Sequence, residues 1–336
     1  MTSPQHGRRR AAPAQDSGAA SPASATASAA PVLEVPARTP HRPDVDPIVP
    51  EVSEKPAPTH STKRRSAGRN LPAAIIVGVT LILVVLSAIY LVPAMLTPLV
   101  ALVVVIGALE VTNALENANL RVPAIPLLVA SVGMIVSAAV YGADGLLVSA
   151  AVGVLVLIVW RVVEATGLMA VRDTVASIFT LLWVPFLASF AVLLMAQPHG
   201  QHKLLFVIAV PIANDVGGYV AGVLLGKHPM APSISPKKSW EGFAGSLLTG
   251  VVIAALIGHF LLPELGAGVA ALFGVVMVVV ATVGDLCESL LKRDLGIKDM
   301  GQLLPGHGGI MDRLDSMLLT APTLFIMLAL WEAFGG

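Results

Sequence analysis

Long apolar stretches follow one another along the chain from Leu71 onward and are separated by short polar breaks. Each stretch is close to the roughly 20 residues that a helix needs to cross a membrane. Nine can be placed, near residues 71–91, 94–115, 123–141, 144–163, 173–196, 203–225, 241–262, 267–290 and 313–333. They lack the alternation of apolar and polar residues that membrane β-strands show. The pattern therefore predicts an all-α polytopic membrane protein with about nine transmembrane helices.

The first 70 residues differ from the rest of the chain. They contain 11 of the 25 prolines and no Phe, Trp or Tyr. Such a segment cannot bury enough apolar surface to offset the entropy that it would lose on ordering. No apolar run follows the basic cluster Arg8–Arg10, so a signal peptide is not expected. We therefore predict a disordered N-terminal tail.

The overall composition supports a membrane location. Hydrophobic residues make up 55% of the chain and charged residues only 12%, whereas soluble domains contain about 25% charged residues. This excludes an ordinary soluble globular protein. The single cysteine, Cys287, also excludes an intramolecular disulfide and a cysteine-rich metal site.

The positions of the basic residues predict the orientation in the membrane. With nine spans, the tail and every second connection lie on the same side, and of the 21 Lys and Arg residues only Lys203 falls on the other side. Lys and Arg concentrate in cytoplasmic loops. We therefore expect a multi-pass protein of the inner or plasma membrane, with the N-terminus and the long connections 226–240 and 291–312 in the cytoplasm.

Polar residues gather around the last of these connections, in a chain that is otherwise poor in charge. In order they read Ser289-x-x-Lys292-Arg293, Lys298-Asp299, Pro305-Gly306-His307-Gly308-Gly309 and Asp312-Arg313-x-Asp315. Lys and Arg supply donors for phosphate oxygens, and glycines allow backbone N–H groups to approach an anion closely. The segment is typical of a phosphate-binding site.

Carboxylates flank this segment on both sides. Asp285, Glu288 and Lys292 share one face at the end of the eighth predicted helix, because their spacing follows the helical repeat. Asp312 and Asp315 lie about one turn apart where the ninth predicted helix begins. Paired carboxylates beside phosphate-binding cations suit Mg²⁺, which binds one or two carboxylates together with phosphate oxygens and water.

The segment from Ser289 to Asp315 resembles the signature of the phosphatidate cytidylyltransferase (CDP-diacylglycerol synthase) family. It matches the pattern S-x-x-K-R-x4-K-D, P-G-H-G-G and D-R-x-D without a gap. A second block also resembles that family: Asp215, Gly217-Gly218-Tyr219, Gly226-Lys227 and Ser235-Pro236-Lys237-Lys238-Ser239-Trp240-Glu241-Gly242. Gly218 stands where the family usually has Ala. The resemblance covers roughly residues 205–316 and the hydropathy of the membrane region, but not the tail.

The resemblance implies a nucleotidyltransferase reaction in phospholipid biosynthesis, in which CTP and phosphatidate give CDP-diacylglycerol and pyrophosphate. A phosphatidate oxygen would attack the α-phosphorus of CTP in line. Electrostatics dominate such transfers, and a phosphate monoester is already largely ionised at neutral pH, so charge neutralisation matters more than a strong base. The expected partners are the two substrates and the lipid bilayer. A homodimer is left open and no nucleic acid is expected.

The resemblance also assigns roles to particular residues. The predicted cofactor is Mg²⁺ in a two-metal arrangement, with the second ion unidentified, which would polarise the α-phosphate and stabilise pyrophosphate. Its predicted ligands are Asp285 and Asp312, with Asp215 and Asp315 as further contributors. The predicted catalytic residues are Asp285, Asp312, Lys292, Arg293 and His307. The predicted substrate-binding residues are Ser235, Lys237, Lys238, Ser289, Lys298, Asp299, Gly306, Gly308, Gly309 and Arg313.

Some of these residues have a structural alternative. Asp285 inside an apolar span is costly without a partner, which favours function, but Asp215 could instead hydrogen-bond within the helix bundle. His307 could stabilise its turn. Glu110 and Glu116, near the end of the second predicted span, could be polar residues at a helix interface or contributors to the site.

Two other functions remain open from the sequence. A CTP-dependent lipid kinase of the polyprenol or phytol type would share the membrane setting, but it should lack the complete signature. A cation-coupled transporter would carry its ionisable residues near the middle of the bilayer, whereas here they gather at one side. The predicted organisation is a cytoplasmic tail (1–70), N-terminal transmembrane helices (71–200) and a C-terminal transmembrane catalytic region (201–336) with its site at the cytoplasmic face.

Overall fold

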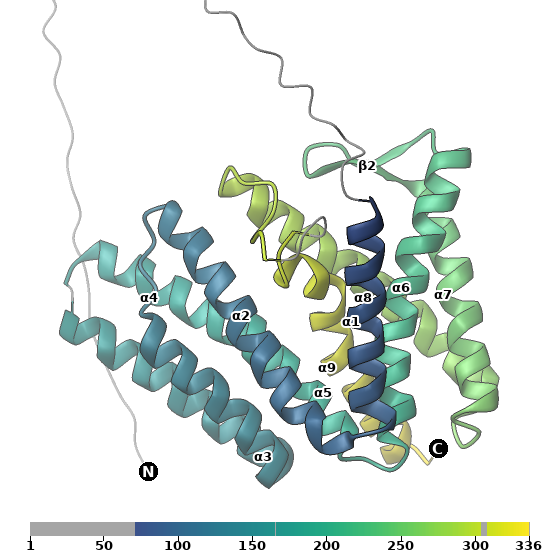
Figure 1. The fold of residues 1–336 in the computed structure, drawn as a ribbon, viewed down its shortest axis with the longest axis horizontal. Coiled ribbons are helices and arrows are strands. Elements are labelled where there is room, and N and C mark those ends of the chain that lie inside the picture. Colours follow the sequence, from purple (N-terminus) through teal and green to yellow (C-terminus); the bar gives the residue numbers. More distant parts are fainter. Residues whose placement is uncertain (1–70, 165, 304–307, 336) are drawn as a thin grey trace, which may run out of the picture. The chain divides into compact units, whose positions relative to one another are not determined.

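The computed structural model describes residues 71–164, 166–303 and 308–335, so the predicted disorder of the tail lies outside the described residues. Helices dominate this part of the chain (Figure 1). They are α1 (Leu71–Tyr90), η1 (Pro93–Met95), α2 (Leu96–Asn117), α3 (Ala124–Glu164), α4 (Leu168–Leu181), η2 (Leu182–Phe186), α5 (Leu187–Met195), α6 (Gly200–Leu225), α7 (Trp240–Phe260), α8 (Gly266–Asp294) and α9 (Met311–Ala333). An antiparallel hairpin of β1 (Pro229–Ala231) and β2 (Ser235–Ser239) joins α6 to α7.

Most of these helices can cross a membrane. Within the described residues, seven segments are long and apolar enough: Pro93–Asn117, Ala124–Glu164, Leu168–Met195, Gly200–Leu225, Trp240–Phe260, Gly266–Asp294 and Met311–Ala333. A shorter apolar helix, Ile76–Tyr90, precedes them. The prediction of an all-α polytopic membrane protein is confirmed, whereas the count of nine spans stays a prediction. Two of the nine predicted spans, 123–141 and 144–163, fall within α3.

The α3 segment reverses direction at Gly142. This residue has φ 68° and ψ −148°, which is not helical and which only glycine adopts readily. A methyl group on Gly153 would lie 3.2 Å from the Cβ of Ala130, whereas a straight helix would place these positions about 34 Å apart. The two halves of α3 therefore pack against each other as a helical hairpin.

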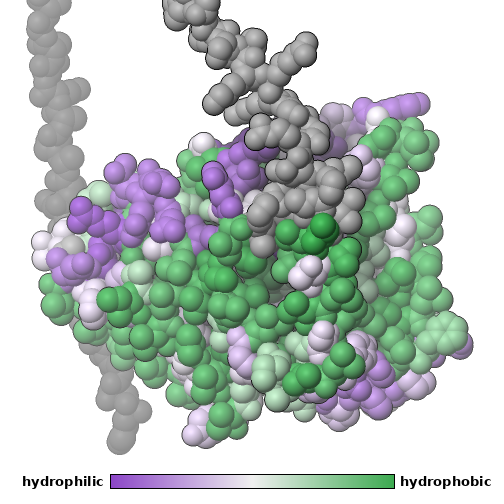
Figure 2. Space-filling model, in the orientation of Figure 1, coloured by the Kyte–Doolittle hydropathy of each residue, from purple (hydrophilic) through white to green (hydrophobic). Residues whose placement is uncertain are grey.

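The exterior of the helices is apolar. Large side chains such as Val163 (83% exposed) and Leu224 (74% exposed) face outward. Figure 2 shows a broad band of apolar residues across the visible face, with polar residues gathered along its upper and lower margins. Such a surface is suited to lipid rather than water. The chain is therefore a multi-pass membrane protein.

Small residues bring α6 and α7 into close contact. A methyl group on Gly217 of α6 would lie 2.7 Å from the carbonyl oxygen of Gly245 on α7, and one on Gly245 would overlap Ala221. The hydroxyl of Thr249 donates a hydrogen bond of 2.8 Å to the carbonyl of Ala213. Close approach through small residues and interhelical hydrogen bonds is the usual packing of membrane helices. The α6–α7 pair forms one wall of the site described below.

Buried apolar side chains form two clusters, and α9 belongs to both. One cluster is built mainly from α2 to α5, with Leu127 and Leu181 among its members, and it includes Met311 of α9. The other is built mainly from α6 to α8, with Phe206 among its members, and it includes Leu324 of α9. The beginning of α9 is thus packed against the N-terminal helices and its later part against the C-terminal ones. The predicted division at residue 200 stays a prediction.

Candidate active site

Polar residues from distant parts of the chain meet at one end of the helices. Lys238 of β2 forms an ion pair with Asp285 of α8. Arg293, at the end of α8, donates a hydrogen bond of 3.2 Å from Nε to the carbonyl of Ile234 at the tip of the hairpin. The hairpin and the C-terminal end of α8 are therefore neighbours. This brings the two sequence blocks that carry the predicted chemistry together.

The same end of the bundle contains a second set of polar contacts. Asp173 of α4 forms an ion pair with Arg161 of α3 and accepts a hydrogen bond of 3.0 Å from the backbone N–H of Arg121. At the opposite ends of the helices, Lys203 donates a hydrogen bond of 2.9 Å to Gln197. Arg161 (3% exposed) and Lys203 (5% exposed) are the buried basic side chains in the described part of the chain, and each has a polar partner.

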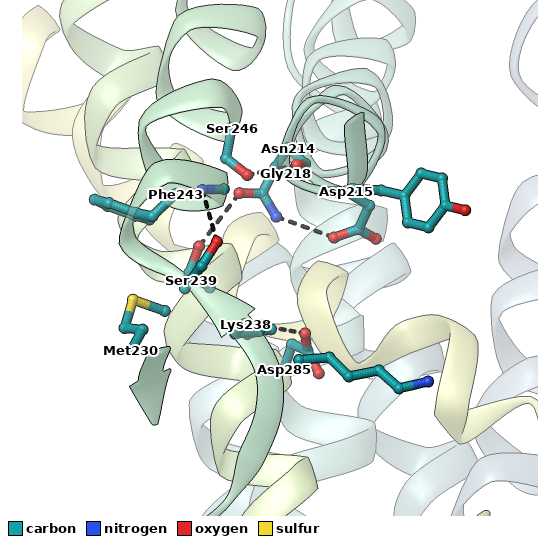
Figure 3. A pocket seen from close by; sticks show the side chains of 13 residues that line it. Asn214, Asp215, Gly218, Met230, Lys238, Ser239, Phe243, Ser246 and Asp285 are labelled. Atoms are coloured by element: carbon teal, nitrogen blue, oxygen red, sulfur yellow. Dashed lines mark hydrogen bonds and ion pairs between the residues drawn. The ribbon is translucent and has the colours of Figure 1, made fainter. Parts of the chain in front are cut away.

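A cavity of about 250 Å³ lies between α6, the hairpin, α7 and α8 (Figure 3). Four of the predicted site residues line it: Asp215, Lys237, Lys238 and Asp285. In Figure 3 the Lys238–Asp285 pair lies below Asp215, so carboxylates and a lysine face the same space. Ser289 donates a hydrogen bond of 3.3 Å to Asp285 from one turn further along α8. The cavity can accept an anion at its lysines and a cation at its carboxylates.

Asn214 joins three walls of this cavity. Its side-chain N–H donates a hydrogen bond of 3.0 Å to Asp215, and its side-chain oxygen accepts one of 3.2 Å from Thr282 of α8. Its backbone carbonyl accepts a hydrogen bond of 2.6 Å from Ser246 of α7. Asn214, Ser246 and Thr282 are not among the site residues predicted from the sequence. The sequence could have indicated them, because polar side chains inside apolar spans are energetically costly unless they have partners.

Gly218 of α6 faces Ser246 of α7, whose hydroxyl is hydrogen-bonded to Asn214. A methyl group there would lie 2.5 Å from the hydroxyl oxygen of Ser246. Gly218, the residue that departs from the family pattern, therefore leaves room for the hydroxyl of Ser246.

A second group of predicted residues surrounds Asp312, at the start of α9. Its carboxylate accepts hydrogen bonds from Lys292 Nζ (2.9 Å), from the backbone N–H of Met300 (3.0 Å) and from that of Gly309 (2.9 Å). Lys292 also lies 3.3 Å from a carboxylate oxygen of Glu288. Asp312 is buried, with 8% of its surface exposed, and its carboxylate is hydrogen-bonded by three donors. It holds the segment before α9 in place, whatever further role it has.

Glu288 and Asp315 lie between these two groups. Glu288 is fully buried, and Lys292 Nζ lies 3.3 Å from one of its carboxylate oxygens. The carboxylate of Asp315 is near those of Glu288 and Asp285. A methyl group on Gly284 would lie 2.6 Å from the carbonyl oxygen of Asp315, so α8 and α9 are in close contact here. In the sequence, Glu288 stands out only by its helical spacing from Asp285 and Lys292.

The remaining predicted residues are spread over the same end of the protein. Lys298, Asp299 and Arg313 are exposed. A methyl group on Gly308 would lie 3.0 Å from an Asp312 carboxylate oxygen. Ser235 pairs with Ala231 within the hairpin. Gly306 and His307 lie outside the described residues. The roles of all these residues stay predictions.

Several carboxylates at this end of the helices are candidate ligands for Mg²⁺. Among the residues that the structure describes, no three His, Cys, Asp or Glu side chains are close enough to form a metal cage of their own. Mg²⁺ does not need such a cage, because it usually binds one or two carboxylates and takes its other ligands from phosphates and water. The cavity-facing carboxylates of Asp215 and Asp285 are hard oxygen donors of the right type. The residues present therefore fit a substrate-dependent Mg²⁺ site.

Comparisons with known proteins agree with this arrangement. Residues 72–331 match the cytidylyltransferase family. The phosphatidate cytidylyltransferase of Mycobacterium bovis is 40% identical over 282 residues, which cover 80% of this chain and 92% of that protein. The phosphatidate cytidylyltransferase of Mycobacterium leprae is 42% identical over 287 residues, covering 81% and 91%. That of Haemophilus influenzae is 44% identical over a shorter range of 129 residues, covering 37% of this chain and 44% of that protein.

Proposed function

The chain belongs to the cytidylyltransferase family, and from that premise we propose that it transfers the cytidylyl group of CTP to phosphatidate. The products are CDP-diacylglycerol and pyrophosphate. One observation carries the proposal: the two separate sequence blocks converge on one cavity, where Lys238 pairs with Asp285. That cavity lies at an end of membrane helices, where a lipid headgroup can meet a water-soluble nucleotide.

The reaction joins two polyanions, so the main task of the protein is to offset their negative charge. A phosphate oxygen of phosphatidate attacks the α-phosphorus of CTP, and the bond from that phosphorus to the oxygen bridging to the β-phosphorus breaks. The negative charge of the departing pyrophosphate needs cationic partners nearby. Lys237 and Lys238 line the cavity and can donate to phosphate oxygens. Lys238 would then exchange its carboxylate partner for a phosphate.

The carboxylates supply the other half of this arrangement. Asp285 and Asp215, which line the cavity, would hold Mg²⁺, with Asp315 as a neighbouring contributor. When bound, Mg²⁺ would neutralise phosphate charge and polarise the α-phosphate. Asp312 also remains a predicted ligand, although its hydrogen bonds to Lys292 and to two backbone N–H groups support a role in holding the loop.

The distribution of basic residues supports a cytoplasmic active site. The site lies at the same end of the helices as the Arg161–Asp173 pair and the hairpin lysines, while Lys203 lies at the other end. Under the positive-inside rule, the lysine-rich and arginine-rich end faces the cytoplasm. The N-terminus would then be cytoplasmic as well, and CTP would reach the cavity directly from the cytosol.

Two labelled forms of CTP test this function. Purified protein in detergent is incubated with phosphatidate, Mg²⁺ and CTP labelled at either the α- or the γ-phosphate. We expect α-label in a CDP-lipid and γ-label in pyrophosphate only. Transfer of γ-label to a lipid would instead identify a CTP-dependent lipid kinase. A cation-coupled transporter would become the better explanation if neither label were transferred by protein whose thermal unfolding transition shows that it is folded.

A further inference from the structure

Glu110 of α2 is a buried carboxylate that lies outside both sequence blocks of the site. It is 8% exposed. Its Oε1 accepts a hydrogen bond of 3.1 Å from the backbone N–H of Ile310, and its Oε2 accepts one of 2.8 Å from that of Met311. These N–H groups are at the beginning of α9, where the first backbone donors of a helix have no partner within it. Glu110 therefore caps α9 from a different helix, and its negative charge suits the positive end of the helix dipole.

Two glycines make this contact close. A methyl group on Gly309 would lie 2.5 Å from Oε2 of Glu110, and one on Gly301 would overlap Oε1. Neither glycine has a positive φ. The backbone conformation at these positions would accept alanine. Glycine is required because the Glu110 carboxylate occupies the space that a side chain would fill.

A second carboxylate holds the same segment from the other side. Asp312 accepts hydrogen bonds from the backbone N–H groups of Met300 and Gly309, while Glu110 accepts those of Ile310 and Met311. The segment leading into α9 is therefore fixed between α2 and the first turn of α9. The position of that turn sets the positions of the predicted site residues Asp312 and Asp315.

We propose that Glu110 is a positioning residue of the active site, which holds the first turn of α9 so that Asp312 and Asp315 face the reacting phosphates. It does so without touching substrate. The inference rests on the proposed cytidylyltransferase function. It assigns a contribution to the site from the N-terminal helices, about 200 residues away from α9 in sequence.

The test compares Glu110→Gln with Glu116→Gln, since Glu116 lies on the same helix and is exposed. An amide can accept through one atom only, so the glutamine leaves one buried N–H without its partner. We expect kcat to fall about 30-fold, as for the loss of a charge-assisted hydrogen bond, while KM for CTP changes less than about threefold. In metal-free protein without substrate, hydrogen exchange in peptides containing Ile310 and Met311 should become at least tenfold faster. Glu116→Gln should leave both unchanged.

Two further variants make the test independent of one substitution. Glu110→Asp keeps the charge but shortens its reach, so we expect a kcat between those of the wild type and Glu110→Gln. Gly301→Ala disturbs the same carboxylate from the loop side and should reproduce the loss of kcat and the faster exchange. If Glu110→Gln cannot be purified folded, Gly301→Ala decides.

Two results would overturn the proposal: a kcat within twofold of wild type in the folded variant, or unchanged exchange at Ile310 and Met311. Failure of the proposed function would look different, since the wild type itself would then form no CDP-diacylglycerol while the exchange result still reported on the cap.

Discussion

Lys238 of the β-hairpin and Asp285 of α8 form an ion pair across the candidate cavity. Lys238 was predicted to bind phosphate and Asp285 to bind a metal ion, and in the structure each is the charged partner of the other. Both side chains are about one quarter exposed, so the pair can open without a large change in packing. Under the proposed function, binding of a nucleotide together with Mg²⁺ would supply each of them with a new partner of opposite charge.

Replacing Asp285 should abolish turnover. Asp285→Asn removes the negative charge and one hard oxygen ligand, so raising Mg²⁺ should restore little activity. The protein should still insert and purify normally, because the side chain is partly exposed. Asp144→Asn, an exposed carboxylate near the reversal of α3, is the control and should keep normal activity. Near-normal turnover of Asp285→Asn with unchanged Mg²⁺ dependence would make Asp215 the leading candidate ligand.

Replacing Lys238 should weaken nucleotide binding more than it affects the chemistry at saturation. Lys238→Ala removes a charge-assisted contact worth about 1.5–3 kcal/mol, which corresponds to an increase in the apparent KM for CTP of about 10- to 150-fold. Excess CTP should then recover much of the rate. Lys238→Arg keeps the charge and should show a smaller increase. Steady-state kinetics at varied CTP measure both, and an unchanged KM in Lys238→Ala would argue against a phosphate contact.

Replacing Asp312 should affect stability as well as turnover. Asp312→Asn leaves Lys292 beside fewer negative charges and cannot accept all the hydrogen bonds that the carboxylate accepts. Breaking a buried pair typically costs about 3 kcal/mol or more, so the thermal unfolding midpoint in detergent should fall clearly, and turnover should be lost. Asp285→Asn should lose turnover without a comparable fall in that midpoint. Equal unfolding midpoints for the two variants would show that Asp312 does not hold the loop.

The topology can be tested by thiol labelling in intact cells. Cys287 is exposed, so the experiment starts from a Cys287→Ala background. Ser233 at the hairpin tip, Gln302 before α9 and Glu264 between α7 and α8 are all exposed and suit replacement by cysteine. With a cytoplasmic active site, Ser233→Cys and Gln302→Cys should resist an impermeant reagent, whereas Glu264→Cys should react. The reverse pattern of labelling would invert the proposed orientation.

Removing most of the N-terminal tail should have little effect. The composition of residues 2–60 predicts no packed contacts, so their deletion should leave specific activity close to that of the full chain. Lys63–Arg69 are kept because basic residues next to the first span help to set orientation. A loss of specific activity in correctly inserted protein would reveal a function in the tail.

The apolar runs predicted most helices well, because length and hydropathy are local properties of the sequence. They could not predict which ends meet. The Lys238–Asp285 pair joins two blocks that only the resemblance had linked, and Asn214 became visible as a connection between helices only in three dimensions. Glu110 illustrates the limit best. From the sequence, Glu110 could be either a polar residue at a helix interface or a contributor to the site. Its partners, the N–H groups of Ile310 and Met311, are brought close only by the fold.

The close contact between α6 and α7 has a mechanical consequence. Glycines of each helix face the other, and a hydroxyl of α7 is hydrogen-bonded to the backbone of α6, so the two helices cannot separate or slide without losing these contacts. The cavity is bounded on its other side by α8, which is joined to α6 by the hydrogen bond from Thr282 to Asn214. Small residues also bring α8 close to α7, since a methyl group on Gly274 would lie 2.6 Å from the Cβ of Ala254. The helical walls therefore have little room to separate, and the distance between Lys238 and Asp285 depends mainly on the hairpin and on the two side chains.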